Sequence, residues 1–255
     1  MPNTYNIGSS RKRRTAARRP MRRAVMRFRK RYRRRRPFIP RTITPDSKMV
    51  KLRYCFTQEM NPSSGATANM IVRANDILYP SSGAGAHQPM GTDQLFQLYE
   101  RFCVVGSKIN VAFVNHGSSA GNKNVYSIVG IGLRNNQTQE SVQDNTATQS
   151  NEGILERNRT KWRYSGFQGG GAPITQVTHK FGAKRFFHLS SINSNAGNAT
   201  DDGSLWGTSS YSPTALAYYK VFCATFLDSV DTGYTVRVTV DYTCVFQGRK
   251  LLGQS

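Results

Sequence analysis

The chain has 255 residues, and its 36 Lys and Arg residues against 14 Asp and Glu residues give a formal net charge of +22 at pH 7. Such a charge predicts a polyanionic partner. No apolar stretch is long enough to cross a bilayer, and the N-terminal segment lacks the apolar run of a signal peptide. We therefore expect a protein of the cytosol or nucleus with no membrane partner.

The positive charge is concentrated in an N-terminal arm. Between Arg11 and Arg41 lie 17 of the 36 basic residues, and no Asp or Glu precedes Asp46. The arm therefore carries about +17 and the rest of the chain about +5. We expect residues 1–45 to be a nucleic-acid-binding arm and residues 46–255 to be one domain with a substantial core.

Arginine dominates the arm, and its forked guanidinium groups bind phosphate oxygens and release counterions without reading sequence. Three aromatic side chains in the arm, Phe28, Tyr32 and Phe38, are candidates for stacking on unpaired bases. Apolar spacing after Pro20 also permits a helix over about 21–36 once a polyanion is bound. The predicted nucleic-acid-binding residues are Arg11, Lys12, Arg13, Arg14, Arg18, Arg19, Arg22, Arg23, Arg27, Arg29, Lys30, Arg31, Arg33, Arg34, Arg35 and Arg36.

Two clusters in the arm also match basic nuclear-import signals. They predict host nuclear-import receptors as partners, although phosphate binding alone explains the same residues. The clusters are Arg11, Lys12, Arg13 and Arg14, and then Arg31, Arg33, Arg34, Arg35 and Arg36.

The rest of the chain has the alternation of β-strands. In chain order, strands are predicted at about 51–57, 68–73, 108–113, 125–133, 173–181, 217–227 and 236–246. The last is the clearest, because apolar residues alternate with polar ones over its whole length. Val238, Val240 and Tyr242 are expected to point into the core, whereas Thr239 and Thr243 face the other way.

A single short helix is predicted, with Thr92 as its cap and Leu95, Leu98, Tyr99 and Phe102 at helical spacing. Long polar stretches at 61–69, 81–92, 134–152 and 190–214 are rich in Gly, Ser, Asn and Thr, which is typical of loops. Many strands separated by such loops indicate an all-β, antiparallel sandwich or barrel.

The sequence contains no arrangement that indicates catalysis, a metal or a cofactor, so we do not expect an enzyme. The Gly117 to Gly121 segment matches a nucleophile elbow, but it stands between two predicted strands instead of a strand and a helix. Adjacent Asp201 and Asp202 lie in a polar loop, where such carboxylates are usually solvated. The cysteines are far apart and are expected to be buried thiols; they are Cys55, Cys103, Cys223 and Cys244.

An Arg-rich arm followed directly by this set of strands resembles the capsid proteins of small circular single-stranded DNA viruses, in particular circovirus-like capsids. The resemblance lies in pattern and order over most of the chain. The stretches that carry it are Arg31-Tyr-Arg-Arg-Arg-Arg36, Lys51-Leu-Arg-Tyr-Cys-Phe-Thr57, Leu98-Tyr-Glu-Arg-Phe102, Val104-Val-Gly-Ser-Lys-Ile109, Leu216-Ala-Tyr-Tyr-Lys-Val-Phe222 and Tyr234 to Gln247.

The resemblance implies a single viral jelly roll, an eight-stranded antiparallel β-sandwich with elaborate loops, one short helix and the basic arm. It implies a virion protein of which roughly 60 copies form an icosahedral shell. The arm would package a single-stranded DNA genome, and the protein would enter the host nucleus during infection. Two alternatives stay open: the capsid protein of a small single-stranded RNA virus, and a cellular basic nucleic-acid-binding protein with a basic face on its body.

Overall fold

The structure is a computed structural model that describes residues 45–62, 67–81, 87–117, 127–135, 155–165, 174–189, 202–225 and 233–250. All the binding residues predicted from Arg11 to Arg36, the stacking candidates Phe28, Tyr32 and Phe38, and the arm helix lie outside these ranges. The predictions for the arm therefore stay predictions.

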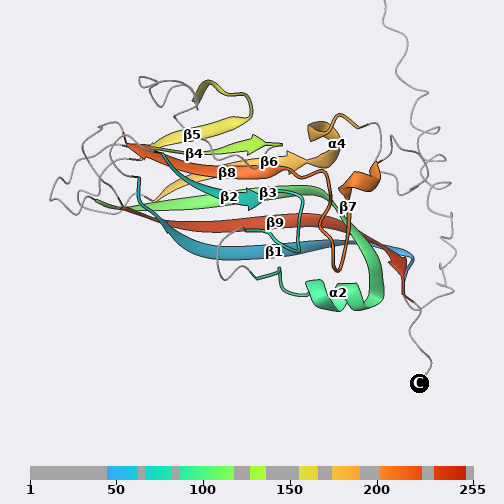
Figure 1. The fold of residues 1–255 in the computed structure, drawn as a ribbon. Coiled ribbons are helices and arrows are strands. Elements are labelled where there is room, and N and C mark those ends of the chain that lie inside the picture. Colours follow the sequence, from blue (N-terminus) through green and yellow to red (C-terminus); the bar gives the residue numbers. More distant parts are fainter. Residues whose placement is uncertain are drawn as a thin grey trace, which may run out of the picture. The chain divides into compact units, whose positions relative to one another are not determined.

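The described residues form two antiparallel sheets that lie as two layers in Figure 1. One sheet has the order β1-β9-β3-β6, with the short β7 paired to β3, and the other has the order β2-β8-β4-β5. The strands are β1 (Ser47–Met60), β2 (Ala68–Arg73), β3 (Tyr99–Gly117), β4 (Ser127–Arg134), β5 (Thr160–Ser165), β6 (Thr175–Gly182), β7 (Trp206–Thr208), β8 (Tyr218–Thr225) and β9 (Gly233–Arg249).

The strand order is that of a jelly roll. Without β7, eight strands form two four-stranded sheets, and the first strand of the chain pairs with the last while the second pairs with the one before the last. Two nested antiparallel pairings of this kind, packed face to face, characterise the double-sheet jelly roll. The predicted fold class is confirmed.

Strand β9 is the centre of the first sheet, because it pairs along its length with β1 on one side and β3 on the other. Val240 lies opposite both Tyr54 and Ile109, and all three side chains are buried. Its neighbours Val238 and Tyr242 are also fully buried, so the predicted inward face of this strand is confirmed. Alternation gives the strand its second, outward face.

In the described ranges more helix accompanies the sheets than the single helix that was predicted. The segments include α2 (Thr92–Leu98), α4 (Ala183–Phe186) and the 3-10 segment η1 (Asp202–Leu205). Phe96 of α2 packs edge-on against Phe102 and Phe246 and so covers one end of the core. None of the helices in the described ranges is long and apolar enough to span a membrane.

The predicted helix was wrong at both ends. Gly91, with φ at 87°, occupies the N-cap position, and the Thr92 hydroxyl donates instead to the Pro89 carbonyl at 2.7 Å. Tyr99 and Phe102 belong to β3, where they pair with β9. Tertiary pairing of these residues overrides the short helical periodicity that they share with Leu95 and Leu98.

Strand β2 has its predicted bounds, and β1, β3, β4, β6, β8 and β9 contain or overlap the other predicted strands. Strand β5 was not predicted, because its aromatic residues alternate with cations over only four positions and four of its six residues are exposed. Strand β7 and η1 lie within the predicted loop 190–214. Most of the predicted loop 134–152 lies outside the described residues.

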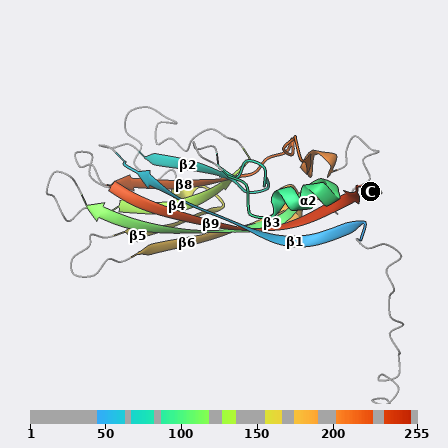
Figure 2. The ribbon, with the colours of Figure 1, turned by 90° about the horizontal axis from the view of Figure 1, so that it is seen from below.

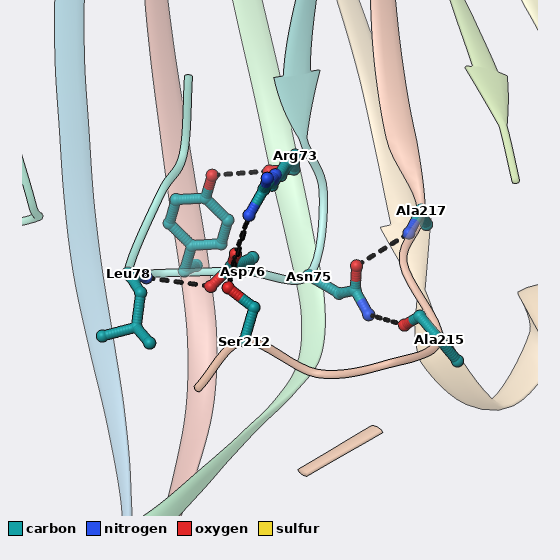
Figure 3. A network of polar contacts seen from close by, with 8 residues as sticks. Arg73, Asn75, Asp76, Leu78, Ser212, Ala215 and Ala217 are labelled. Atoms are coloured by element: carbon teal, nitrogen blue, oxygen red, sulfur yellow. Dashed lines mark hydrogen bonds and ion pairs between the residues drawn. The ribbon is translucent and has the colours of Figure 1, made fainter. Parts of the chain in front are cut away.

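A buried carboxylate fixes the turn that follows β2 (Figure 3). Asp76 is fully buried, and its Oδ2 accepts hydrogen bonds from the Arg73 guanidinium at 2.6 Å and the Ser212 hydroxyl at 2.7 Å. Its Oδ1 accepts the backbone N–H of Leu78 at 2.9 Å. The Tyr242 hydroxyl donates to the Arg73 carbonyl at 2.7 Å, which joins the turn to the central strand.

Asn75, the residue before Asp76, also links the turn after β2 to the segment before β8. The amide nitrogen of Asn75 donates to the Ala215 carbonyl at 2.7 Å, and its Oδ1 accepts the N–H of Ala217 at 2.8 Å. Together with the bond to Ser212, these contacts tie the turn after β2 to the segment before β8. The side chains thus satisfy backbone groups of a segment that has no sheet partner.

Candidate nucleic-acid interface

Strands β1, β9, β3 and β6 belong to one sheet (Figure 2), and its outward face gathers basic residues that are far apart in the sequence. The side chains that alternate with the core residues of these strands point away from the sandwich. Five of them are exposed cations that come from all four strands, and we term them the basic face: Lys51, Arg53, Lys108, Lys180 and Arg237.

Three of these cations lie in one row across the sheet. The strand register places Arg53 opposite Asp241, Asp241 opposite Lys108, and Lys108 opposite Lys180. With neighbouring strands about 4.8 Å apart, the row is about 14 Å wide. The row therefore presents cations on both sides of one carboxylate.

Asp241 lowers the positive potential of this row. Its Oδ1 accepts a hydrogen bond from Nε of Arg53 at 2.7 Å, and this bond and the carboxylate charge raise the pKa of Arg53. The Arg53 side chain is largely exposed and that of Asp241 is partly exposed, so the pair adds little to stability. Glu59, near the end of β1, is a second carboxylate on this face, and the five cations outnumber the two anions.

Polar side chains form the next row of the sheet. Cys55, Thr239, Asn110 and Thr178 face one another across the four strands. The Thr178 hydroxyl donates to Oδ1 of Asn110 at 3.1 Å, and the Cys55 thiol lies 3.6 Å from the Thr239 hydroxyl. A face of hydroxyl, amide and cationic groups suits the phosphates of a nucleic acid better than an apolar protein partner.

In the part of the chain that it describes, the structure gives no support for a catalytic site at the Gly117 to Gly121 segment or for a metal site at Asp201 and Asp202. Gly117 ends β3, and the rest of the Gly117 to Gly121 segment lies outside the described residues, as does Asp201. Within the described ranges, no group of three or more His, Cys, Asp or Glu side chains is placed to hold a metal ion.

The cysteines are free thiols, and three of the four are buried as predicted, whereas Cys55 is half-buried. Burial raises the pKa of Cys223 to about 12, and burial followed by the charge of Cys103 raises that of Cys244 further. Thiols with a raised pKa are poor nucleophiles at neutral pH. They pack as small apolar side chains.

The sequence did not predict the basic face. Each of its cations is an outward residue of an alternating strand, but alternation does not say which strands become neighbours. Lys108 and Lys180 meet only because β3 pairs with β6. The signal that is present in the sequence is the polar face of each strand, such as Lys51 and Arg53 on either side of buried Leu52.

No protein-family model matches the chain, and no curated protein matches its sequence. Solved structures match its fold. The 60-mer BFDV capsid protein is 10% identical, with 82% of this chain and 97% of that chain covered and a TM-score of 0.42. The structure of turnip yellow mosaic virus is 9% identical, with 82% of this chain and 99% of that chain covered and a TM-score of 0.40.

The semi-empty virus-like particle of the giant freshwater prawn Macrobrachium rosenbergii nodavirus is 9% identical, with 84% of this chain and all of that chain covered and a TM-score of 0.40. All three matches are virus structures. Because the TM-scores are below 0.5, the jelly-roll assignment of this chain rests on its own strand order and register.

Proposed function

We propose that this chain is a viral capsid protein that self-assembles into a small icosahedral shell and packages a single-stranded DNA genome. The observation that carries the proposal is a jelly-roll sandwich joined in one chain to an arm of about +17. The sandwich offers rigid surfaces for repeated contacts between identical subunits. The arm, residues 1–45, offers sequence-independent affinity for phosphates.

The charge of the arm suits the packaging of a very small genome. A shell of roughly 60 copies would bring about a thousand arm charges into its interior, enough to neutralise on the order of a thousand phosphates. The basic face adds further cations in the sandwich itself. We propose that it makes a weaker phosphate contact than the arm, because Asp241 and Glu59 offset part of its charge.

Single-stranded DNA is proposed over RNA because of the two import-like clusters, Arg11 to Arg14 and Arg31 to Arg36. A virus whose genome is DNA has more need of the host nucleus, so import receptors are proposed partners. A capsid protein of a small single-stranded RNA virus is the second candidate, since phosphate contacts are common to both nucleic acids.

The third candidate function is that of a cellular nucleic-acid-binding protein. Such a protein is expected to have a basic surface on its body, and the basic face is consistent with this. The arm nevertheless carries about three times the net charge of the body. Self-assembly distinguishes a capsid protein from a cellular nucleic-acid-binding protein, because only the capsid protein is expected to form a closed shell.

Nuclease protection tests the proposal. The full-length protein is mixed with single-stranded DNA and RNA of equal length and matched sequence, and nucleases are then added. We expect particles in which the DNA is protected, with DNA in excess over RNA. An excess of protected RNA would favour the RNA-virus capsid, and binding without protection of either would favour the cellular protein.

A further inference from the structure

Strand β5 is an edge strand of the second sheet, and it exposes an alternating set of cations and aromatic rings. Lys161, Trp162, Arg163 and Tyr164 are all exposed, with 36% of Trp162 and 61% of Tyr164 accessible to solvent. Alternation along a strand places the two rings on one face and the two cations on the other. The strand thus presents both kinds of side chain at one edge of the sandwich.

The two aromatic rings form a pair on the outer face of the sheet. Their centroids lie 5.2 Å apart, and their planes meet at 75°. Trp162 lies opposite Gly130 and Tyr164 opposite Ile128 on the neighbouring β4. The Phe222 ring occupies the space where a side chain of residue 130 would lie. A Cβ added at Gly130 would come within 2.4 Å of Cζ of Phe222.

Further cations surround the start of the strand. Residues 155–165 contain four cations and one carboxylate, Glu156. The guanidinium of Arg159 lies 4.7 Å from the centre of the Phe186 ring. On β4, Arg134 donates to the Asn158 carbonyl and to the Thr160 hydroxyl, both at 2.8 Å. These contacts hold positive charge at the start of β5.

The cations of β5 also lie next to the sheet that carries the basic face. Strands β5 and β6 are edge strands of the two sheets and contact each other. The pKa of His179 on β6 is lowered, first by burial and in part by the charge of Lys161, so Lys161 lies near β6. The residue after His179 is Lys180 of the basic face.

A simpler explanation accounts for only half of this surface. Charged residues on an edge strand prevent it from pairing with the edge of another molecule, which explains Lys161 and Arg163. It does not explain two large aromatic rings left exposed on the opposite face. An edge strand with aromatic rings on one face and cations on the other offers both the charge and the flat apolar surface that a single-stranded polyanion with unpaired bases requires.

We propose that β5 is a base-stacking site for single-stranded nucleic acid. Trp162 and Tyr164 stack on unpaired bases, and Lys161 and Arg163 contact the neighbouring phosphates. The inference deepens the proposed function and rests on its nucleic-acid ligand, but the site belongs to the sandwich and requires neither the arm nor a closed shell.

Tryptophan fluorescence tests the site in the full-length chain, which has two tryptophans, Trp162 and Trp206. Trp206→Phe leaves Trp162 as the only reporter, and Trp162→Phe leaves Trp206 as the matched control. Each variant is titrated with an oligothymidylate of about 20 nucleotides and with an abasic oligomer of the same length and charge. The oligothymidylate is expected to quench Trp162 strongly, the abasic oligomer to quench it little, and Trp206 to respond to neither.

Affinity measurements separate stacking from charge. Trp162→Ala is expected to weaken oligothymidylate binding about fivefold or more and to leave abasic binding unchanged. Arg163→Gln should weaken the binding of both oligomers equally. Circular dichroism checks that Trp162→Ala, a change at a partly exposed position, keeps the fold.

Three results would overturn the inference: equal quenching of Trp162 by the two oligomers, no quenching when both are bound, or a change in Trp162 emission that follows self-association without nucleic acid. The last would assign β5 to a subunit contact. Base-specific quenching without shells would uphold this site and contradict the capsid proposal, whereas shells without such quenching would do the reverse.

Discussion

The carboxylate of Asp241 lies between two cations on neighbouring strands: it accepts a hydrogen bond from Nε of Arg53 at 2.7 Å and stands opposite Lys108 in the register of β3 and β9. This placement makes Asp241 the residue that most directly weakens the attraction of the basic face for a polyanion. The same carboxylate contributes little to stability, because it is partly exposed and its partner Arg53 is largely exposed.

Asp241→Asn should therefore raise the affinity for single-stranded DNA at low salt without unfolding the protein. Removing one negative charge beside Arg53 strengthens phosphate contacts, and the plot of log affinity against log salt should steepen by at most about one unit. A filter-binding salt series measures this. Asp93→Asn on α2 is the control with the same change in net charge, and an equal gain from both variants would remove the basic face from the binding surface.

Asp76→Ala should strongly destabilise the sandwich. The substitution leaves the partly buried Arg73 guanidinium without its carboxylate, and breaking such a pair costs about 3–5 kcal/mol. Ser212→Ala removes one hydrogen bond from the same carboxylate and should cost only about 1 kcal/mol. Urea unfolding compares the two, and equal free energies of unfolding would show that Asp76 does not hold the turn.

Val240→Asp should prevent soluble expression. Val240 is fully buried between Tyr54 and Ile109, and an unpaired charge there costs several kcal/mol. Thr243→Asp is the matched control on the outward face, opposite Lys51. The control should fold and should bind polyanions more weakly, because it places a carboxylate on the basic face; solubility assays and filter binding report the two outcomes.

The fold could be predicted from the sequence where strands have one buried and one exposed face. Val238, Val240 and Tyr242 alternate with polar residues, and this pattern alone predicts β9. Strand β5 shows this alternation over only four residues, and as an exposed edge strand it buries few of its side chains. At Tyr99 and Phe102 the same apolar residues fit either a helix or a strand, and pairing with β9 decided between them.

The two candidate nucleic-acid-binding sites, the arm and the basic face, also differ in how far the sequence predicts them. The arm was predicted from charge alone, because a run of arginines needs no partner strand to be recognised. The basic face depends on register: Arg53, Lys108 and Lys180 are separated by dozens of residues and form a row only when β1, β9, β3 and β6 are neighbours. Alternation predicts which way each side chain points but not which strands pair.

Residues 1–41 should supply most of the polyanion affinity. Their deletion removes about +17 of the total +22, so single-stranded DNA binding should fall steeply and lose most of its salt dependence. The same segment fused to a fluorescent reporter should accumulate in the nucleus of eukaryotic cells. Unchanged DNA affinity would remove the arm from packaging, and diffuse fluorescence would count against nuclear import.

Electron microscopy of the purified full-length protein with single-stranded DNA tests the central claim most directly. A jelly-roll capsid protein with an Arg-rich arm should form closed, isometric shells of uniform diameter, with the DNA inside. Assembly should also respond to ionic strength, because salt screens the repulsion between basic subunits. A protein that stays monomeric or forms only open, irregular complexes with DNA at every salt concentration would contradict the capsid assignment.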